Sequence, residues 1–126
     1  MTAALDGMRI LVVEDEFLVA TLLQDMLEAA GCRVFGPMAR VAEALDAVDN
    51  GAYDAAVLDV NLGGERIDPV ADALSRRKVP FMFVTGYGAG VLPEGFAGRP
   101  RLSKPFRLDD LLGTLSGLFE HPVDCL

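Results

Sequence analysis

Acidic, hydroxyl and basic side chains follow short apolar runs at four places in the chain. Glu14 and Asp15 come after the first run, Asp59 after another, Thr85 after a third, and Lys104 after a weaker one. Carboxylates about 4 Å apart repel each other by roughly 4 kcal/mol at an effective dielectric near 20, so a cation must reside among them. Oxygen ligands without His or Cys favour a hard divalent ion, Mg²⁺ before Ca²⁺. A carboxylate beside Mg²⁺, with an ammonium and a hydroxyl in reach, is suited to attack phosphorus.

Asp59 is the acid best placed to be the nucleophile. It ends a run that we expect to form a central strand, and the Gly63-Gly64 turn that follows leaves room for a substrate. Asp15, taken alone, is equally well explained as the N-cap of a helix. The only histidine, His121, lies near the C-terminus, where we expect an exposed side chain and not a ligand.

These residues need elements that bring them together, and the hydrophobic pattern predicts strands alternating with helices. The continuous apolar runs indicate buried strands, and apolar residues spaced by three and four indicate helices. Strands are predicted at residues 10–13, 34–35, 55–58, 81–84 and 101–103, and helices at 19–30, 41–48 and 108–119 and from Asp68, an expected N-cap followed by Pro69. The second strand is expected to end at Gly36-Pro37. This alternation predicts an α/β fold, a doubly wound five-stranded parallel sheet whose carboxyl edge gathers the polar residues.

The stretch from residue 86 to residue 100 differs from the rest of the chain. It holds five glycines and two prolines, which penalise a helix by roughly 1 kcal/mol per glycine and more per proline. A loop or a frayed turn is therefore expected there, and the fourth helix of the fold is expected to be short or missing.

Length and composition narrow the class of protein. The chain has 126 residues, which fits one domain, and its net charge of −8 opposes binding to nucleic acid or to an anionic membrane surface. No apolar run is long enough to span a bilayer, and residues 1–7 lack the basic and apolar regions of a signal peptide, so we expect neither an anchor nor export. We expect a domain at residues 8–120 between a flexible N-terminal tail, residues 1–7, and a C-terminal tail, residues 121–126. Cys32 and Cys125 are expected to be unpaired thiols in a reducing cytoplasm.

Four parts of the sequence together resemble the receiver domain of two-component response regulators. They are the segment Val13-Glu14-Asp15-Glu16, the run AAVLD ending at Asp59, the residue Thr85, and the segment Lys104-Pro105-Phe106. The resemblance covers residues 8–120. It implies a flavodoxin-like sheet with strand order 2-1-3-4-5. It also implies that Asp59 accepts a phosphoryl group from a phosphohistidine on a sensor histidine kinase or a histidine phosphotransfer protein. Such a protein is no enzyme beyond catalysing its own phosphorylation and dephosphorylation.

The same resemblance assigns a role to each residue around Asp59. Asp15 would bind Mg²⁺ directly, Glu14 would act through water, and Asn61 would offer its backbone carbonyl to the metal. Thr85 would hydrogen-bond the bound phosphoryl group, and Lys104 would pair with it.

Two features depart from an ordinary receiver. Arg101 stands three residues before the lysine, where most receivers carry an aromatic switch residue. The run from Phe83 through Thr85, Gly86 and Tyr87 resembles instead the FATGUY subclass, whose members often pair with HWE-type kinases and have a degenerate fourth helix. Gly86 and Tyr87 would then tune the switch, although Tyr87 is also explained as a half-buried packing residue. We expect phosphorylation to pull on Thr85 and reshape residues 86–100.

The bond between Lys104 and Pro105 is expected to be cis by the same resemblance. Two other functions stay open on the sequence. Asp59-Val60-Asn61 resembles the D-x-D motif of haloacid-dehalogenase phosphohydrolases, although Asn61 cannot serve as their proton donor. The second function that stays open is that of a phosphorylation-independent protein-interaction module. The sequence does not distinguish whether the protein acts as a relay, as a phosphate sink or as an effector on an unknown downstream protein.

Overall fold

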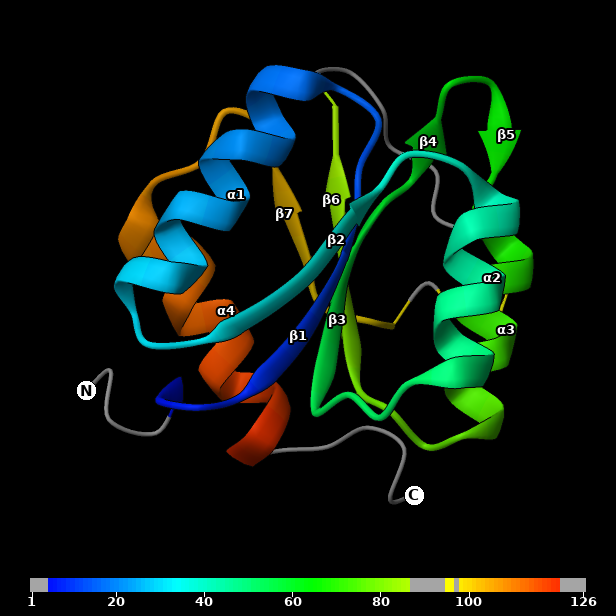
Figure 1. Ribbon diagram of the computed structural model, residues 1–126. Coiled ribbons are helices and arrows are strands. Elements are labelled where there is room, and N and C mark those ends of the chain that lie inside the picture. Colours follow the sequence, from blue (N-terminus) through cyan, green and yellow to red (C-terminus); the bar gives the residue numbers. More distant parts are fainter. Residues whose placement is uncertain (1–4, 87–94, 97, 121–126) are drawn as a thin grey trace.

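One parallel sheet of five strands forms the centre of the molecule. The computed structural model describes residues 5–86, 95–96 and 98–120. The strands are β1 (Arg9–Val13), β2 (Arg33–Met38), β3 (Ala55–Asp59), β6 (Phe81–Thr85) and β7 (Arg101–Ser103), in the order β2-β1-β3-β6-β7 (Figure 1). All four pairings are parallel. The predicted doubly wound sheet with strand order 2-1-3-4-5 is confirmed.

Helices cover both faces of this sheet, which explains why its central strands are apolar along their length. Helices α1 (Phe17–Ala29) and α4 (Leu108–Glu120) pack on one face, and α2 (Val41–Asn50) and α3 (Asp68–Arg76) on the other (Figure 1). Successive side chains of a strand point to opposite faces. On β6, Phe81 and Phe83 therefore join the core under α2 and α3, and Met82 and Val84 join the core under α1 and α4.

Near its end, the stretch between β6 and β7 packs against the core through an aromatic side chain. Its described residues, 86, 95–96 and 98–100, form no helix. The Phe96 ring packs edge-on against Phe81 and Phe83, at centroid distances of 5.7 and 6.4 Å. The Arg99 guanidinium lies 4.3 Å above the Phe81 ring and donates a hydrogen bond to the Ser75 hydroxyl of α3 at 3.2 Å. These contacts fix the end of the stretch beside α3.

Two local predictions were wrong. β2 continues through Gly36 and Pro37 to Met38, because it is an edge strand with a hydrogen-bonded neighbour on one side only, where proline is tolerated. Asp68 is the first helical residue of α3 and not its N-cap, which is Ile67; the Asp68 carboxylate accepts a hydrogen bond from Arg66 at 2.8 Å.

The glycine turn after Asp59 belongs to a small hairpin that the sequence did not predict. Its strands are β4 (Asn61–Leu62) and β5 (Glu65–Arg66), which pair antiparallel across Gly63 and Gly64. The Glu65 carboxylate accepts a hydrogen bond at 3.0 Å from the backbone N–H of Val41, at the start of α2. The hairpin is thereby tied to the helix layer.

The described core also takes in a residue from the segment expected as an N-terminal tail. Leu5 is fully buried, and its carbonyl lies 3.5 Å from the Cys32 sulfur. Cys32 is a free thiol, and burial raises its pKa. His121 and Cys125 lie outside the described residues. Within the described part of the chain, no helix combines the length and the apolar character needed to cross a membrane.

Candidate functional site

The strand register brings the predicted acidic residues together. β1 and β3 pair with Val13 opposite Leu58, so Glu14, which follows β1, and Asp59, the last residue of β3, lie side by side at the carboxyl edge. Both acids are almost completely buried, with 2% and 4% of their surfaces exposed, whereas Asp15 is exposed. One carboxylate oxygen from each of the three acids lies within 4.8 Å of the others.

The register of β6 and β7 adds the hydroxyl and the ammonium. Asp59 is opposite Val84, and Thr85 is opposite Ser103, so Thr85 and Lys104 reach the same edge. The backbone N–H of Lys104 donates to the Thr85 carbonyl at 2.8 Å. The Thr85 side chain is buried and hydrogen-bonds the Ser103 hydroxyl at 3.5 Å, a partner that the sequence analysis missed.

Lys104 is the cation of the cluster. Its Nζ lies 3.1 Å from Glu14 Oε1 and 3.6 Å from Asp59 Oδ2. Burial alone lowers the pKa of this ammonium, but the charges of Asp59 and Glu14 and hydrogen bonds to Glu14 and Glu16 outweigh that effect, and the pKa is raised overall. Lys104 is therefore a permanent positive charge at the site.

The environment of Asp59, in contrast, disfavours the charged form of its side chain. Its pKa is raised to about 8, first by burial and then by a hydrogen bond with Glu14 and the charge of that residue. The Lys104 charge and the backbone N–H of Asn61, which donates to Asp59 Oδ1 at 3.2 Å, oppose the shift without cancelling it. One ammonium does not balance two buried carboxylates, so the site favours further positive charge.

The donor set fits a hard divalent cation. Glu14 Oε1 is buried and has no hydrogen-bond partner, although it lies 3.1 Å from the Lys104 nitrogen. Such an unsatisfied buried oxygen is rare and requires an explanation. Three carboxylates without His or Cys are the ligand type that Mg²⁺ takes, usually together with several waters. Glu14, Asp15 and Asp59 could therefore hold Mg²⁺.

The hairpin after Asp59 closes one side of the cluster. A side chain at Gly63 would place its first carbon 3.0 Å from the Asp15 carboxylate, and this glycine has a φ of +57°. The Asn61 side chain accepts a hydrogen bond from the Gly64 N–H at 3.3 Å, which shapes the turn. The Gly63-Gly64 pair was the sequence signal for this close approach.

The remaining predicted site residues lie around this cluster. The Lys104–Pro105 bond is cis. Gly86 follows β6 beside the pocket, and Arg101 is exposed at the start of β7. Tyr87 falls outside the described residues. Asp15 is not a helix N-cap, because that position of α1 belongs to Glu16.

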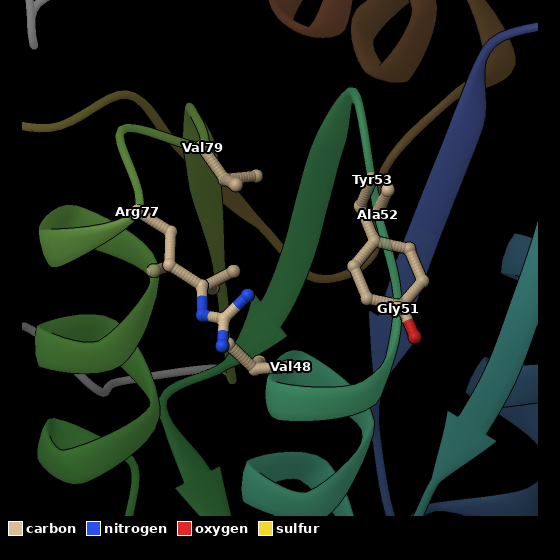
Figure 2. A pocket seen from close by; sticks show the side chains of 7 residues that line it. Val48, Gly51, Ala52, Tyr53, Arg77 and Val79 are labelled. Atoms are coloured by element: carbon tan, nitrogen blue, oxygen red, sulfur yellow. The ribbon is translucent and has the colours of Figure 1, made fainter.

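The cluster opens into a pocket of about 320 Å³, lined by Asp15, Glu16, Asp59, Asn61, Gly63, Gly86 and Lys104. A second pocket of about 230 Å³ lies between the ends of α2 and α3, where Arg77 extends toward Val48 (Figure 2). Its lining includes no acidic side chain, and Arg77 is paired with Asp49 at 3.5 Å. Of these two pockets, only the one at the carboxyl edge suits a cation and a phosphoryl group.

Comparisons with known proteins place this geometry in a family. The model of the response regulator receiver domain matches residues 10–116. The transcriptional regulatory protein TcrA of Mycobacterium tuberculosis is 40% identical over an alignment of 119 residues that covers 89% of this chain and 46% of TcrA. The chain therefore spans about half the length of the curated relatives it matches. The solution structure of SdrG from Sphingomonas melonis Fr1 is 45% identical, with a TM-score of 0.82 over 90% of this chain and 97% of that one. The receiver domain of the Erythrobacter litoralis response regulator PhyR is 27% identical, with a TM-score of 0.77 over 94% of this chain and 95% of that one. The chain is a member of the response regulator receiver domain family of two-component signalling.

Proposed function

We propose that the protein is a cytoplasmic phosphoacceptor whose Asp59 takes a phosphoryl group from a phosphohistidine. The donor would be a sensor histidine kinase, HWE-type kinases included, or a histidine phosphotransfer protein. The observation that supports this most is the buried Asp59 carboxylate, which faces an open pocket between Lys104 and the unsatisfied Glu14. The negative net charge argues against nucleic acid as the downstream target and favours a protein.

Asp59 must lose its proton before it can attack, because its pKa near 8 keeps the carboxyl neutral around pH 7 in the metal-free protein. Mg²⁺ held by Asp15, Asp59 and the Asn61 backbone carbonyl, with Glu14 acting through water, would supply the positive charge that lowers this pKa and offsets the charge of the phosphoryl group.

In the transfer, an Asp59 oxygen forms a bond to phosphorus while the phosphorus–nitrogen bond of the phosphohistidine breaks. The imidazole leaves with the electron pair of that bond, and it leaves neutral when the other nitrogen of the phosphohistidine ring already carries a proton. Lys104 pairs with a phosphoryl oxygen, and the Thr85 hydroxyl exchanges its long 3.5 Å hydrogen bond with Ser103 for one to the phosphoryl group. The protein turns over no other substrate; it acts as a relay, a phosphate sink or an effector.

Acetyl phosphate with and without MgCl₂ tests the acceptor chemistry, with intact mass spectrometry as the readout. We expect one phosphoryl group per chain, only with Mg²⁺, and none in Asp59→Asn. The exposed Asp72 of α3 gives a matched control, because Asp72→Asn makes the same change in charge away from the site. Labelling that persists in Asp59→Asn, or no labelling of the unmodified protein, would refute the proposal. The second outcome would leave a phosphorylation-independent module.

The start of α1 offers a surface for the phosphodonor. Phe17 and Leu18 are each 78% exposed, and Leu22 is 43% exposed, which is unusual for large apolar side chains on one helix. Beside them lies a pocket of about 350 Å³, lined by Glu16, Val19, Leu22, Gly86, Lys104, Pro105 and Phe106. A donor must cover the mouth of the site to bring its imidazole to Asp59, so these residues would contact it.

Labelling by two donors distinguishes docking from chemistry. We expect Leu18→Ser to reduce labelling by a phosphorylated histidine kinase at least severalfold while labelling by acetyl phosphate is unchanged. Equal loss with both donors would place the defect in the site itself, and no loss with the kinase would exclude this surface as the docking site.

The proposed switch runs along β6, because Arg101 occupies the usual place of the aromatic switch residue. Phe83 lies two residues before Thr85 and contacts Phe96, so a shift of Thr85 toward the phosphoryl group is transmitted to the end of the 86–100 stretch. Amide hydrogen exchange with and without beryllofluoride and MgCl₂ tests this idea. We expect altered protection at Phe96 and Arg99, and identical protection in both states would contradict it.

A further inference from the structure

Glu16 has an arrangement that the helix it starts does not explain. It is the N-cap residue of α1, a position that favours the short polar side chains of Ser, Thr, Asp and Asn, and its longer side chain makes no capping hydrogen bond. Its Oε1 instead accepts a hydrogen bond from the Lys104 nitrogen at 3.3 Å, across 88 positions of sequence. The contact spans from α1 to the residue after β7.

This contact engages one N–H group of the cation that the phosphoryl group needs. The Lys104 ammonium has three N–H groups, and it donates to Glu14 Oε2 at 3.4 Å and to Glu16 Oε1 at 3.3 Å. Its nitrogen also lies 3.1 Å from Glu14 Oε1. Asp59 Oδ2 lies at 3.6 Å, outside hydrogen-bond distance. The Lys104 side chain is only 15% exposed, so water does not readily replace these partners.

The two acids that pair with Lys104 differ in solvent exposure, and therefore in the free energy that breaking each ion pair costs. The Glu14 side chain has no exposed surface, whereas the Glu16 side chain is 65% exposed and is solvated again as soon as it releases the ammonium. Glu16, Gly86 and Lys104 line both the pocket above Asp59 and the apolar pocket beside α1. The Glu16–Lys104 pair thus lies where the two pockets meet.

We propose that Glu16 is a positioning residue that competes with the phosphoryl group for Lys104. This inference rests on the proposed function. In the unphosphorylated protein Glu16 holds the ammonium toward α1; in the phosphorylated protein the ammonium moves to a phosphoryl oxygen and Glu16 turns to solvent. Glu16 therefore weakens the phosphorylated state and favours its loss. The Glu16 side of this ion pair is exposed to solvent, which keeps its worth modest, so the expected effect is roughly two- to fivefold.

Two substitutions separate the contact from the charge. Glu16→Gln removes the charge but keeps the length of the side chain, whereas Glu16→Asp keeps the charge and is one methylene shorter, which withdraws the carboxylate from Lys104. Asp25→Asn is the matched control, because Asp25 is exposed on the same helix farther from the site. The probe is beryllofluoride, formed from BeCl₂ and NaF at saturating MgCl₂, and binding is followed by the amide resonance of Thr85.

We expect both Glu16 variants to bind beryllofluoride about two- to fivefold more tightly than the unmodified protein and Asp25→Asn. We also expect Glu16→Gln to change nothing when Lys104 is already replaced by Met. Unchanged affinity in Glu16→Gln, Glu16→Asp that behaves as the unmodified protein, or an effect that persists without Lys104 would each overturn the inference. Failure of the proposed function is distinct, because the unmodified protein would then show no saturable response to beryllofluoride.

Discussion

Asp59 couples the chemistry of the site to the stability of the protein. Its pKa is about 8 in the folded protein and near 3.8 when the chain is unfolded, so between these values the folded state holds a proton that unfolding releases. Stability therefore decreases as the pH rises from about 4 to about 8, by at most about 1.4 kcal/mol per pH unit. Above pH 8 the full penalty of the buried charge remains.

Replacing this carboxyl should remove the penalty. We expect Asp59→Asn to be more stable than the unmodified protein in EDTA by roughly 2 kcal/mol at pH 8, because an amide is neutral at every pH. The difference should shrink toward pH 5. Urea denaturation of both proteins across this range is the measurement, with Asp72→Asn as the control for net charge. A destabilised Asp59→Asn at pH 8 would contradict this account of the buried carboxylates.

Among the elements, β2 depends on one residue without a side chain. Gly36 has a φ of +106°, and a first side-chain carbon there would lie 2.6 Å from the Val12 carbonyl and 2.8 Å from the Met38 nitrogen. These are backbone atoms of β1 and β2, which cannot move aside cheaply. The glycine that was expected to end the second strand is instead what lets the strand pass close to β1.

Alanine substitutions at two glycines should have opposite effects. We expect Gly36→Ala to lower the free energy of unfolding by 2 kcal/mol or more, on the order of other strained backbone sites. Gly113, in the middle of α4, has no atom within 4 Å of the added carbon. Gly113→Ala should therefore raise stability by about 0.5–1 kcal/mol. Thermal unfolding of both variants checks this, and equal effects would mean that the close approach of β2 is misjudged.

For the molecule as a whole, Mg²⁺ should act as a stabilising ligand. The net charge is −8, and two buried carboxylates share one ammonium at the end of the sheet. If Mg²⁺ binds only the folded state, a concentration of one hundred times its dissociation constant should raise the free energy of unfolding by about 2.7 kcal/mol. Melting curves in MgCl₂ and in NaCl of equal ionic strength measure this increase.

The acidic cluster provides the variant that separates site binding from charge screening. Asp15→Asn should lose most of the Mg²⁺-dependent increase while keeping the salt response, since Asp15 is exposed and its replacement leaves the core unchanged. An equal gain in NaCl would show that only the overall negative charge is being screened.

The sequence by itself determined which residues meet. Polar side chains that end successive buried strands must reach one edge of a parallel sheet, so the cluster of Asp15, Asp59, Thr85 and Lys104 followed from the pattern of apolar runs. That inference needs only local periodicity and the rule that connections between parallel strands are right-handed.

Only the tertiary structure decided the pairings within that cluster. Hydrogen bonds and pKa values depend on distances of a few ångströms between residues far apart in sequence, and these follow from strand register and burial. Three features depend on the tertiary structure in this way: the hydrogen bond from Lys104 to Glu16, the unsatisfied Glu14 oxygen, and the pKa of Asp59 near 8. The path of β2 through Gly36 is another example, because the lack of room for a side chain at Gly36 depends on where β1 lies.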